Sequence, residues 1–208
     1  MGLFLSKSIV NYICNSSNSP VFSKKNGGEF IPMQIENMVS LVSRTGRQFQ
    51  RYEKGCRQVV GCIPYRYRKT EKTSSDEELE VLVISSQKGK GMLFPKGGWE
   101  MDESIEEAAK RETLEEAGVI GHLETRLGMW RYKSKSQGAF HEGYMFPLLV
   151  QQQLELWPEK SSRKREWMTV AEAREACQNW WMKEALEKLV CRQMQPQPKG
   201  EEEDTTCT

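Results

Sequence analysis

From residue 57 onward, apolar runs alternate with polar or glycine-containing stretches, a pattern that predicts a domain built largely from β-strands. Strands are expected at 57–67, 79–86, 92–95, 123–134, 140–152 and 164–170. A helical spacing of apolar residues follows at 170–194 and predicts a closing amphipathic helix. Its core-facing positions are expected to be Ala173, Cys177, Trp180 or Trp181, Leu186 and Leu189. Strands combined with two helices indicate a compact α/β or α+β domain.

The other predicted helix lies between the strands, and the sequence marks both of its ends. Ser104 can be the N-cap, and Glu107, three residues later, completes a capping box. Gly118 stands where a left-handed residue would end the helix. We therefore expect one short helix between these two positions.

This helix begins with an apolar face that turns acidic. Ala108 and Ala109 start the face, and helical spacing continues it to Glu112 and Glu116. Glu115 lies beside them, in the last turns, where the helix dipole disfavours anions. Carboxylates three and four residues apart repel one another unless a cation lies between them. Glutamate oxygens are a usual environment for magnesium, so the spacing favours a metal site.

The alternative is a solvated helix laced with salt bridges, which is the common explanation for an acidic helix. Arg111 is four residues from both Glu107 and Glu115, so it can orient a glutamate as well as offset negative charge.

Charge elsewhere is balanced overall but locally uneven. The net charge of +1 gives no global field that would point to nucleic acid. A basic segment stands out against one acid, Glu53, and contains Arg44, Arg47, Arg51, Lys54 and Arg57. It is either a basic loop in solvent or a binding surface for a small polyanion.

Cysteine spacing and hydropathy exclude some classes of protein. The six cysteines include no CxxC pair, which argues against a zinc site and a disulfide framework. A reducing compartment is the simpler expectation. No apolar run is long enough to span a membrane.

The two ends of the chain are expected to lie outside the folded domain. Residues 1–37 are predicted to be a disordered or targeting extension, and 194–208 a disordered acidic tail. Gly2 and Ser6 fit a myristoylation pattern, and Cys14 could carry a second acyl anchor. A mitochondrial transit peptide is the alternative, because no acid precedes Glu29, although no arginine precedes Arg44 either. A start at Met33 or Met38 also remains open.

A spaced motif around the helix resembles the Nudix box of the Nudix hydrolases. It consists of Gly97, Glu103, Arg111, Glu112, Glu115, Glu116 and Gly118. The resemblance implies a Nudix-like α/β/α sandwich at 38–193, with a mixed β-sheet, a catalytic loop–helix–loop and a C-terminal helix. Thr113 departs from the family pattern, which usually has an aliphatic residue there.

The resemblance also implies the chemistry, which is metal-dependent hydrolysis of a pyrophosphate bond. Glu112, Glu116 and the carbonyl of Gly97 would hold Mg²⁺, with Mn²⁺ possible. Glu115 would be the general base and Arg111 its catalytic neighbour. A water nucleophile, neutralised phosphoryl oxygens and positioning are what this reaction needs.

Flanking segments are similar to one branch of that family. Residues 54–66 and 161–173 resemble the diphosphoinositol and diadenosine polyphosphate phosphohydrolases, and 94–103, 142–150 and 180–186 look most like its plant members. Such substrates carry many negative charges, and arginine suits phosphate best. The expected substrate ligands are Arg47, Arg51, Arg57, Lys96, Arg163 and Arg165. A charged edge strand is the alternative for 163–165, and an ordinary strand residue for His141.

Three functions remain open at this point. The first is hydrolysis of diphosphoinositol polyphosphates, with diadenosine polyphosphates as second substrates. The second is hydrolysis of another nucleoside diphosphate derivative, such as a dinucleotide, nucleotide sugar or RNA cap. The third is a non-catalytic Nudix ligand-binding module.

The expected partner is a small polyanionic phosphate, with no nucleic acid and with membrane contact only through a lipid anchor. We expect a cytoplasmic protein, or a mitochondrial one if the extension is a transit peptide.

Overall fold

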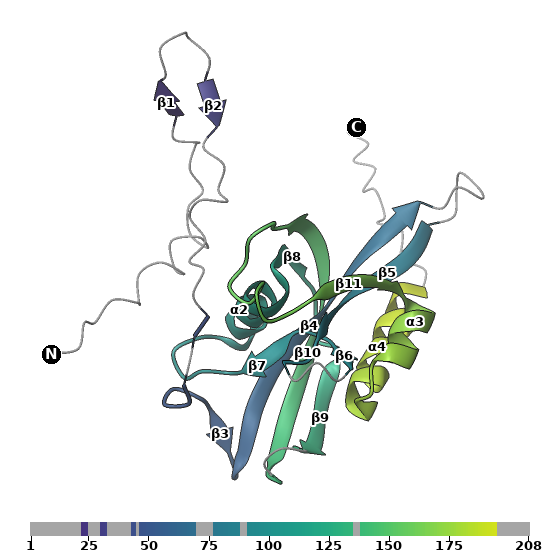
Figure 1. Ribbon diagram of the computed structural model, residues 1–208. Helices are drawn as coiled ribbons and strands as arrows, with labels where there is room; N and C mark the ends of the chain where they lie inside the picture. Colours follow the sequence, from purple (N-terminus) through teal and green to yellow (C-terminus); the bar gives the residue numbers. More distant parts are fainter. Residues whose placement is uncertain are drawn as a thin grey trace, which may run out of the picture.

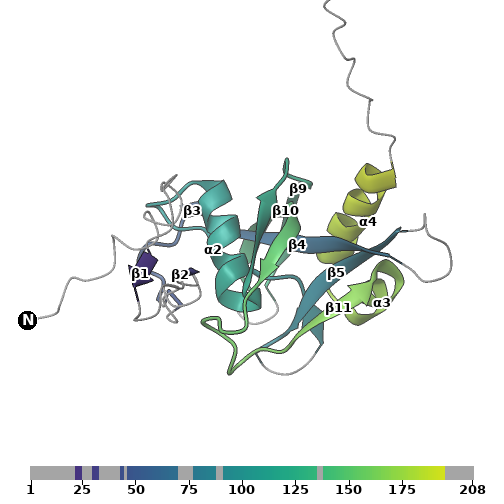
Figure 2. The same ribbon diagram turned by 90° about the horizontal axis from the view of Figure 1, so that it is seen from above.

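The computed structural model describes residues 43–44, 46–69, 77–87, 91–134 and 138–194, and the backbone of strands β1 (Phe22–Lys24) and β2 (Phe30–Pro32). Within the described residues, nine strands form one mixed sheet. They are β3 (Tyr52–Glu53), β4 (Cys56–Lys69), β5 (Glu77–Ser85), β6 (Met92–Leu93), β7 (Lys96–Gly98), β8 (Val119–Leu123), β9 (Gly128–Lys133), β10 (Phe140–Gln153) and β11 (Arg165–Thr169). Helix α2 (Ile105–Ala117) covers one face, and α3 (Val170–Ala176) and α4 (Trp180–Met194) cover the other (Figures 1 and 2).

Two long strands, β4 and β10, form the spine of the sheet. They run parallel, with His141 beside Arg57 at one end and Leu149 beside Tyr65 at the other. The other pairings are antiparallel: β3, β5 and β7 with β4, β6 and β11 with β5, and β8 and β9 with β10. The strand order β11-β5-β4-β10-β8 confirms the expected mixed sheet.

Alternation along the central strands divides the core into two halves. Val60 and Cys62 of β4 are buried in the cluster that contains Ala108 and Ala109 of α2. Ile63, one residue further along β4, is buried with α3 and α4 instead. Successive side chains of a strand point to opposite faces, so one apolar run supplies both cores. This confirms the α/β/α sandwich.

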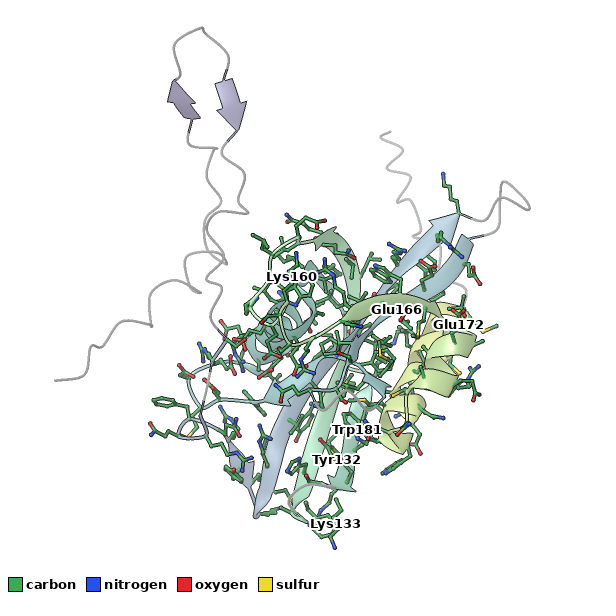
Figure 3. All side chains as sticks on the ribbon, in the orientation of Figure 1. Tyr132, Lys133, Lys160, Glu166, Glu172 and Trp181 are labelled. Carbon is green, nitrogen blue, oxygen red and sulfur yellow. The ribbon has the colours of Figure 1, made fainter. Side chains whose placement is uncertain are left out.

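The α3–α4 layer contains the core residues expected of the closing helix. Ala173, Cys177, Trp181, Leu186 and Leu189 are buried, whereas Trp180 is 54 % exposed. The ring of Trp181 stacks on that of Tyr132 from β9 at a centroid distance of 4.7 Å (Figure 3). Trp181, and not Trp180, is therefore the core tryptophan of this pair.

The expectation of a single closing helix was wrong, because the chain forms α3 and then α4. Thr169 and Glu172 form a capping box at the start of α3, and Cys177 leaves the helix with extended dihedrals. The carbonyl of Asn179 accepts hydrogen bonds from Met182 and Lys183 and starts α4. Only residues 177–179 separate the two helices, so the helical spacing of apolar residues in the sequence continues from α3 into α4.

Outside the sandwich, β1 and β2 pair as an antiparallel hairpin in the segment where little fixed structure was expected. The sequence between them contains Asn26-Gly27, a strong hairpin-turn signal. The remaining residues of the 1–37 extension, and 195–208 of the expected tail, lie outside the described residues. In the part of the chain that is described, no helix is long and apolar enough to cross a membrane.

Candidate active site on helix α2

Helix α2 begins and ends as the sequence predicts. The Ser104 hydroxyl accepts a hydrogen bond from the Glu107 N–H, and the Glu107 carboxylate accepts one from the Ser104 N–H. Gly118 ends the helix with φ 63° and ψ 37°. A side chain at this glycine would overlap Trp157, so both the backbone conformation and the space require glycine.

The three glutamates of the last turns are buried, so they do not form a solvated face. The exposed fractions of Glu112, Glu115 and Glu116 are 9 %, 8 % and 5 %. The departing residue, Thr113, is fully buried, and its hydroxyl donates to the Ala109 carbonyl at 2.7 Å. Thr113 thus fills the packing stripe without leaving its polar group unpaired.

Glu103, Glu112, Glu115 and Glu116 form an acidic cluster, and Arg111 contacts one end of it. Its guanidinium donates to both oxygens of Glu103, at 2.8 and 2.7 Å, to Glu112 Oε1 at 2.8 Å and to the Gly98 carbonyl at 3.0 Å. Its Nη1 is 3.6 Å from Glu115 Oε2. Glu107, the other neighbour expected from the spacing, is engaged in the capping box. Arg111 therefore orients the carboxylates of Glu103 and Glu112.

Arg163 holds the other end of the cluster from the loop between β10 and β11. It forms an ion pair with Glu116, and its Nε donates to Glu159 Oε2 at 2.6 Å. Its Nη1 donates to the Ser85 carbonyl at 3.0 Å. The second oxygen of Glu116 accepts from the Lys96 backbone N–H at 2.8 Å. Sequence reasoning placed Arg163 on the substrate, whereas the structure places it on a predicted metal ligand.

Burial raises the pKa of all three glutamates above the ordinary value. Desolvation is the main cause, and it raises the pKa of Glu115 and that of Glu116 to about 7. Arg111 opposes the shift at Glu112 and Glu115, while Lys96 and Arg163 oppose it at Glu116. Burial therefore disfavours the charged form of these carboxylates more strongly than the nearby cations favour it.

The donor set fits a hard divalent cation. Glu112 and Glu116 supply carboxylate oxygens, and the backbone of Gly97 lies so close to Glu112 that a side chain there would overlap its carboxylate. Oxygen ligands of this kind suit Mg²⁺ or Mn²⁺. In the described residues no three acidic, histidine or cysteine side chains already converge on one point. Glu112 and Glu116 turn toward Arg111 and Arg163, so metal binding would require these carboxylates to reorient.

Several of the predicted substrate ligands lie around β7. Lys96 is in β7 itself, and a side chain at Gly98 would overlap the guanidinium of Arg57. Arg51 stacks over the Trp99 ring at 4.1 Å. Arg47, Arg57 and Lys96 all act on one histidine: together with burial, the main cause, they lower the pKa of His141.

Sequence reasoning gave His141 no role. Its Nε2 is buried and has no hydrogen-bond partner among the described residues, as is true of Arg57 Nε. Only the strand register, which places His141 beside Arg57, brings the two together. Unpartnered buried donors of this kind are suited to a ligand.

Arg165 differs from the other predicted substrate ligands. It donates to the carbonyls of Ala117, Gly118 and Leu154 at 2.8, 3.2 and 2.5 Å. Its guanidinium also stacks over Trp157 at 4.0 Å. These contacts hold the end of α2 and leave no support for Arg165 as a substrate ligand.

A mixed sheet with a capped acidic helix on one face is the arrangement expected of the Nudix class, and comparison with known proteins agrees. The NUDIX domain model matches residues 68–189, and the chain belongs to this family. It is 62 % identical over 173 residues to Nudix hydrolase 17, mitochondrial, of Arabidopsis thaliana, covering 83 % of this chain and 95 % of that protein. The chain is therefore an enzyme that acts on phosphoanhydride bonds, which removes the non-catalytic module from the alternatives.

More distant relatives extend the comparison. Diphosphoinositol polyphosphate phosphohydrolase 3-alpha of Mus musculus is 36 % identical over 141 residues, covering 65 % of this chain and 79 % of that protein. The crystal structure of a C. elegans Ap4A hydrolase binary complex aligns with a TM-score of 0.50 at 20 % identity, covering 65 % of this chain and 96 % of that one. At this identity the solved structure supports the fold alone.

Proposed function

We propose that this chain hydrolyses a phosphoanhydride bond in a highly phosphorylated small molecule, with diphosphoinositol polyphosphates as first substrates and diadenosine polyphosphates as second. The relative from Mus musculus is named for the first class, and the C. elegans structure for a member of the second. The structural support for a substrate with several phosphates is a cationic hollow next to the acidic helix.

This hollow lies between the end of β5 and the β10–β11 loop. It is lined by Ser85, Ser86, Gln87, Lys160, Ser161, Ser162, Arg163 and Lys164. Figure 3 shows Lys160 on the loop that runs beside α2. Arg163 joins the hollow to Glu116 through their ion pair. Hydroxyls and ammonium groups beside a carboxylate cluster suit a ligand with several phosphates, because each phosphate can find a cation or a donor.

In the proposed reaction, Glu115 accepts the proton of the attacking water. Arg111 keeps Glu103 and Glu112 in place, and Lys96, Arg57 and His141 bind the phosphates on the β7 side. Glu112, Glu116 and the Gly97 carbonyl would hold Mg²⁺ or Mn²⁺, which when bound supplies positive charge to the phosphoryl oxygens and acidifies water. Glu115 suits a base because its contacts are the longest of the three glutamates, 3.3 Å from the Arg44 N–H and 3.6 Å from Arg111 Nη1, which leaves its oxygens accessible to a water.

The first test compares substrates and one variant. The full chain is assayed with Mg²⁺ and with Mn²⁺ on a diphosphoinositol polyphosphate and on diadenosine hexaphosphate. Glu115→Gln should lower kcat by about 100-fold or more. Glu106→Gln makes the same chemical change at an exposed position of α2 and should leave kcat unchanged. Turnover of the dinucleotide alone would reject the inositol substrate, and full activity of Glu115→Gln would remove Glu115 as the base.

We propose a mitochondrial address for the protein. The names of its Arabidopsis relatives include mitochondrial and chloroplastic designations, which favour the transit-peptide alternative and give no support to a cytoplasmic protein. A fluorescent fusion of the full chain should enter mitochondria, and Gly2→Ala should not change this. Loss of a membrane-bound signal in Gly2→Ala would instead support a myristoyl anchor.

A further inference from the structure

Two residues that precede the matched family domain lie against the acidic cluster. The side chain of Arg44 reaches three carboxylates around the start of α2: Nη1 is 2.5 Å from Glu100 Oε2, 3.3 Å from Asp102 Oδ1 and 3.9 Å from Glu103 Oε2. Glu103 is the residue that Arg111 grips with two hydrogen bonds. Glu103 therefore lies between Arg44 and Arg111 and is a shared partner of both.

The backbone of the same segment reaches the proposed base. The Arg44 N–H donates to Glu115 Oε1 at 3.3 Å. The hydroxyl of Ser43 donates to Glu159 Oε1 at 3.4 Å, and Glu159 is the second partner of Arg163. Ser43 and Arg44 therefore connect the two arginine networks that hold the glutamates of α2.

We propose that Arg44 is a positioning residue that holds the Glu115 carboxylate in place for catalysis. Its side-chain ion pairs anchor the segment, and its backbone N–H donates to Oε1. This contact is shorter than that of Arg111, whose Nη1 is 3.6 Å from Glu115 and whose close contacts go to Glu103 and Glu112. The proposal rests on Glu115 being the base, as proposed above.

The first test measures kinetics in the full chain. Arg44→Ala removes the anchor and should lower kcat by about 10-fold with KM nearly unchanged, since a misplaced base costs rate rather than binding. Arg44→Lys keeps the charge and should recover part of the loss. Arg44→Pro also removes the N–H and should lower kcat further. Arg68→Ala is the control, because Arg68 is an exposed arginine that is also ion-paired, with Glu78 at 3.1 Å.

The second test asks whether Arg44 acts through Glu115. In a Glu115→Gln background, Arg44→Ala should have no further effect on the residual kcat, because residues that act as a unit are not additive. A full 10-fold loss in that background would overturn the proposal. So would a rise of kcat in Arg44→Ala, which would make the segment an inhibitor of the base.

The third test needs no substrate and separates this proposal from the proposed function. Amide hydrogen exchange at Arg44 should accelerate in Glu115→Ala, which removes the acceptor, while the amides of β4 stay protected and report an intact fold. Unchanged exchange at Arg44 would show that the contact is absent. If exchange responds but neither the diphosphoinositol polyphosphate nor the diadenosine polyphosphate is cleaved, the proposed substrates are wrong while the contact stands.

Discussion

Glu115 is the least firmly held of the three buried glutamates. Glu112 accepts a hydrogen bond from Arg111 at 2.8 Å, and Glu116 is paired with Arg163 and with the Lys96 N–H. Glu115 has only a 3.3 Å bond from the Arg44 N–H and a 3.6 Å contact with Arg111. A carboxylate must have a lone pair available to accept a proton. Of the three, Glu115 has the longest contacts, which agrees with its proposed role as the base.

A substitution at Gly97 tests whether the position of the Glu112 carboxylate matters for catalysis. In Gly97→Ala the new methyl group would overlap the Glu112 carboxylate, so Glu112 has to move away. The end of a glutamate moves easily, and the free energy of unfolding should fall by no more than about 2 kcal/mol by urea titration. The kcat should fall by about 100-fold, because a predicted metal ligand is displaced.

The control for Gly97→Ala is a double-mutant cycle with Glu112→Ala. Once the carboxylate is gone, the methyl group has nothing to displace, and Gly97→Ala should cost little more. An equal loss of kcat in both backgrounds would place the effect of Gly97 elsewhere.

At the scale of elements, Arg165 fixes the end of α2 to the β10–β11 loop. The last carbonyls of a helix have no partner within it, and a cation there also suits the helix dipole. Arg165→Ala should therefore lower the free energy of unfolding by about 2–3 kcal/mol in urea. Arg165→Lys should restore little, because one ammonium cannot replace a planar fork stacked on Trp157.

Arg174→Ala is the matched control for Arg165, since it removes an exposed ion pair with Glu187 and should cost less than about 1 kcal/mol. The opposite result, a raised KM with unchanged stability in Arg165→Ala, would restore the original prediction that Arg165 binds substrate.

The elements differ in how far the sequence alone defines them. Helix α2 is predictable because its caps and its face are local: Ser104 and Glu107 lie within four residues of each other. Strand β7 contains two glycines and exists through its pairing with β4, so no local propensity announces it. The same limit applies to the site. The helical spacing indicates Glu112 and Glu116, but the partner of Glu116 is Arg163, 47 residues away.

At the scale of the molecule, the sandwich places two cationic regions at one acidic helix. The first surrounds β7 and contains Lys96 and Arg57; the second is the hollow between β5 and the β10–β11 loop. A substrate that spans both must carry several phosphates. A basic surface is often only a solvated edge, so the second region needs a test of its own.

Lys160→Ala with Lys164→Ala removes two lysines that line the hollow, the first of which donates to the Glu155 carbonyl at 2.6 Å, and leaves Arg163 on Glu116. The KM for a diphosphoinositol polyphosphate should rise about 10-fold, as expected when charge-assisted contacts that bind substrate and transition state alike are lost. The kcat should stay within about twofold. The KM should also become less sensitive to added salt, because fewer charge pairs remain to be screened.

Lys183→Ala on α4 is the control for each single lysine substitution, since it removes one ammonium group from a helix on the opposite face of the sheet from α2 and should leave KM unchanged. The size of the substrate gives the decisive comparison. A ligand too small to reach the hollow, such as inorganic pyrophosphate, should show the same KM with and without the two lysines. If the double variant weakened both substrates equally, the lysines would act through the general field of the protein, and the hollow would not be a binding site for the extra phosphates.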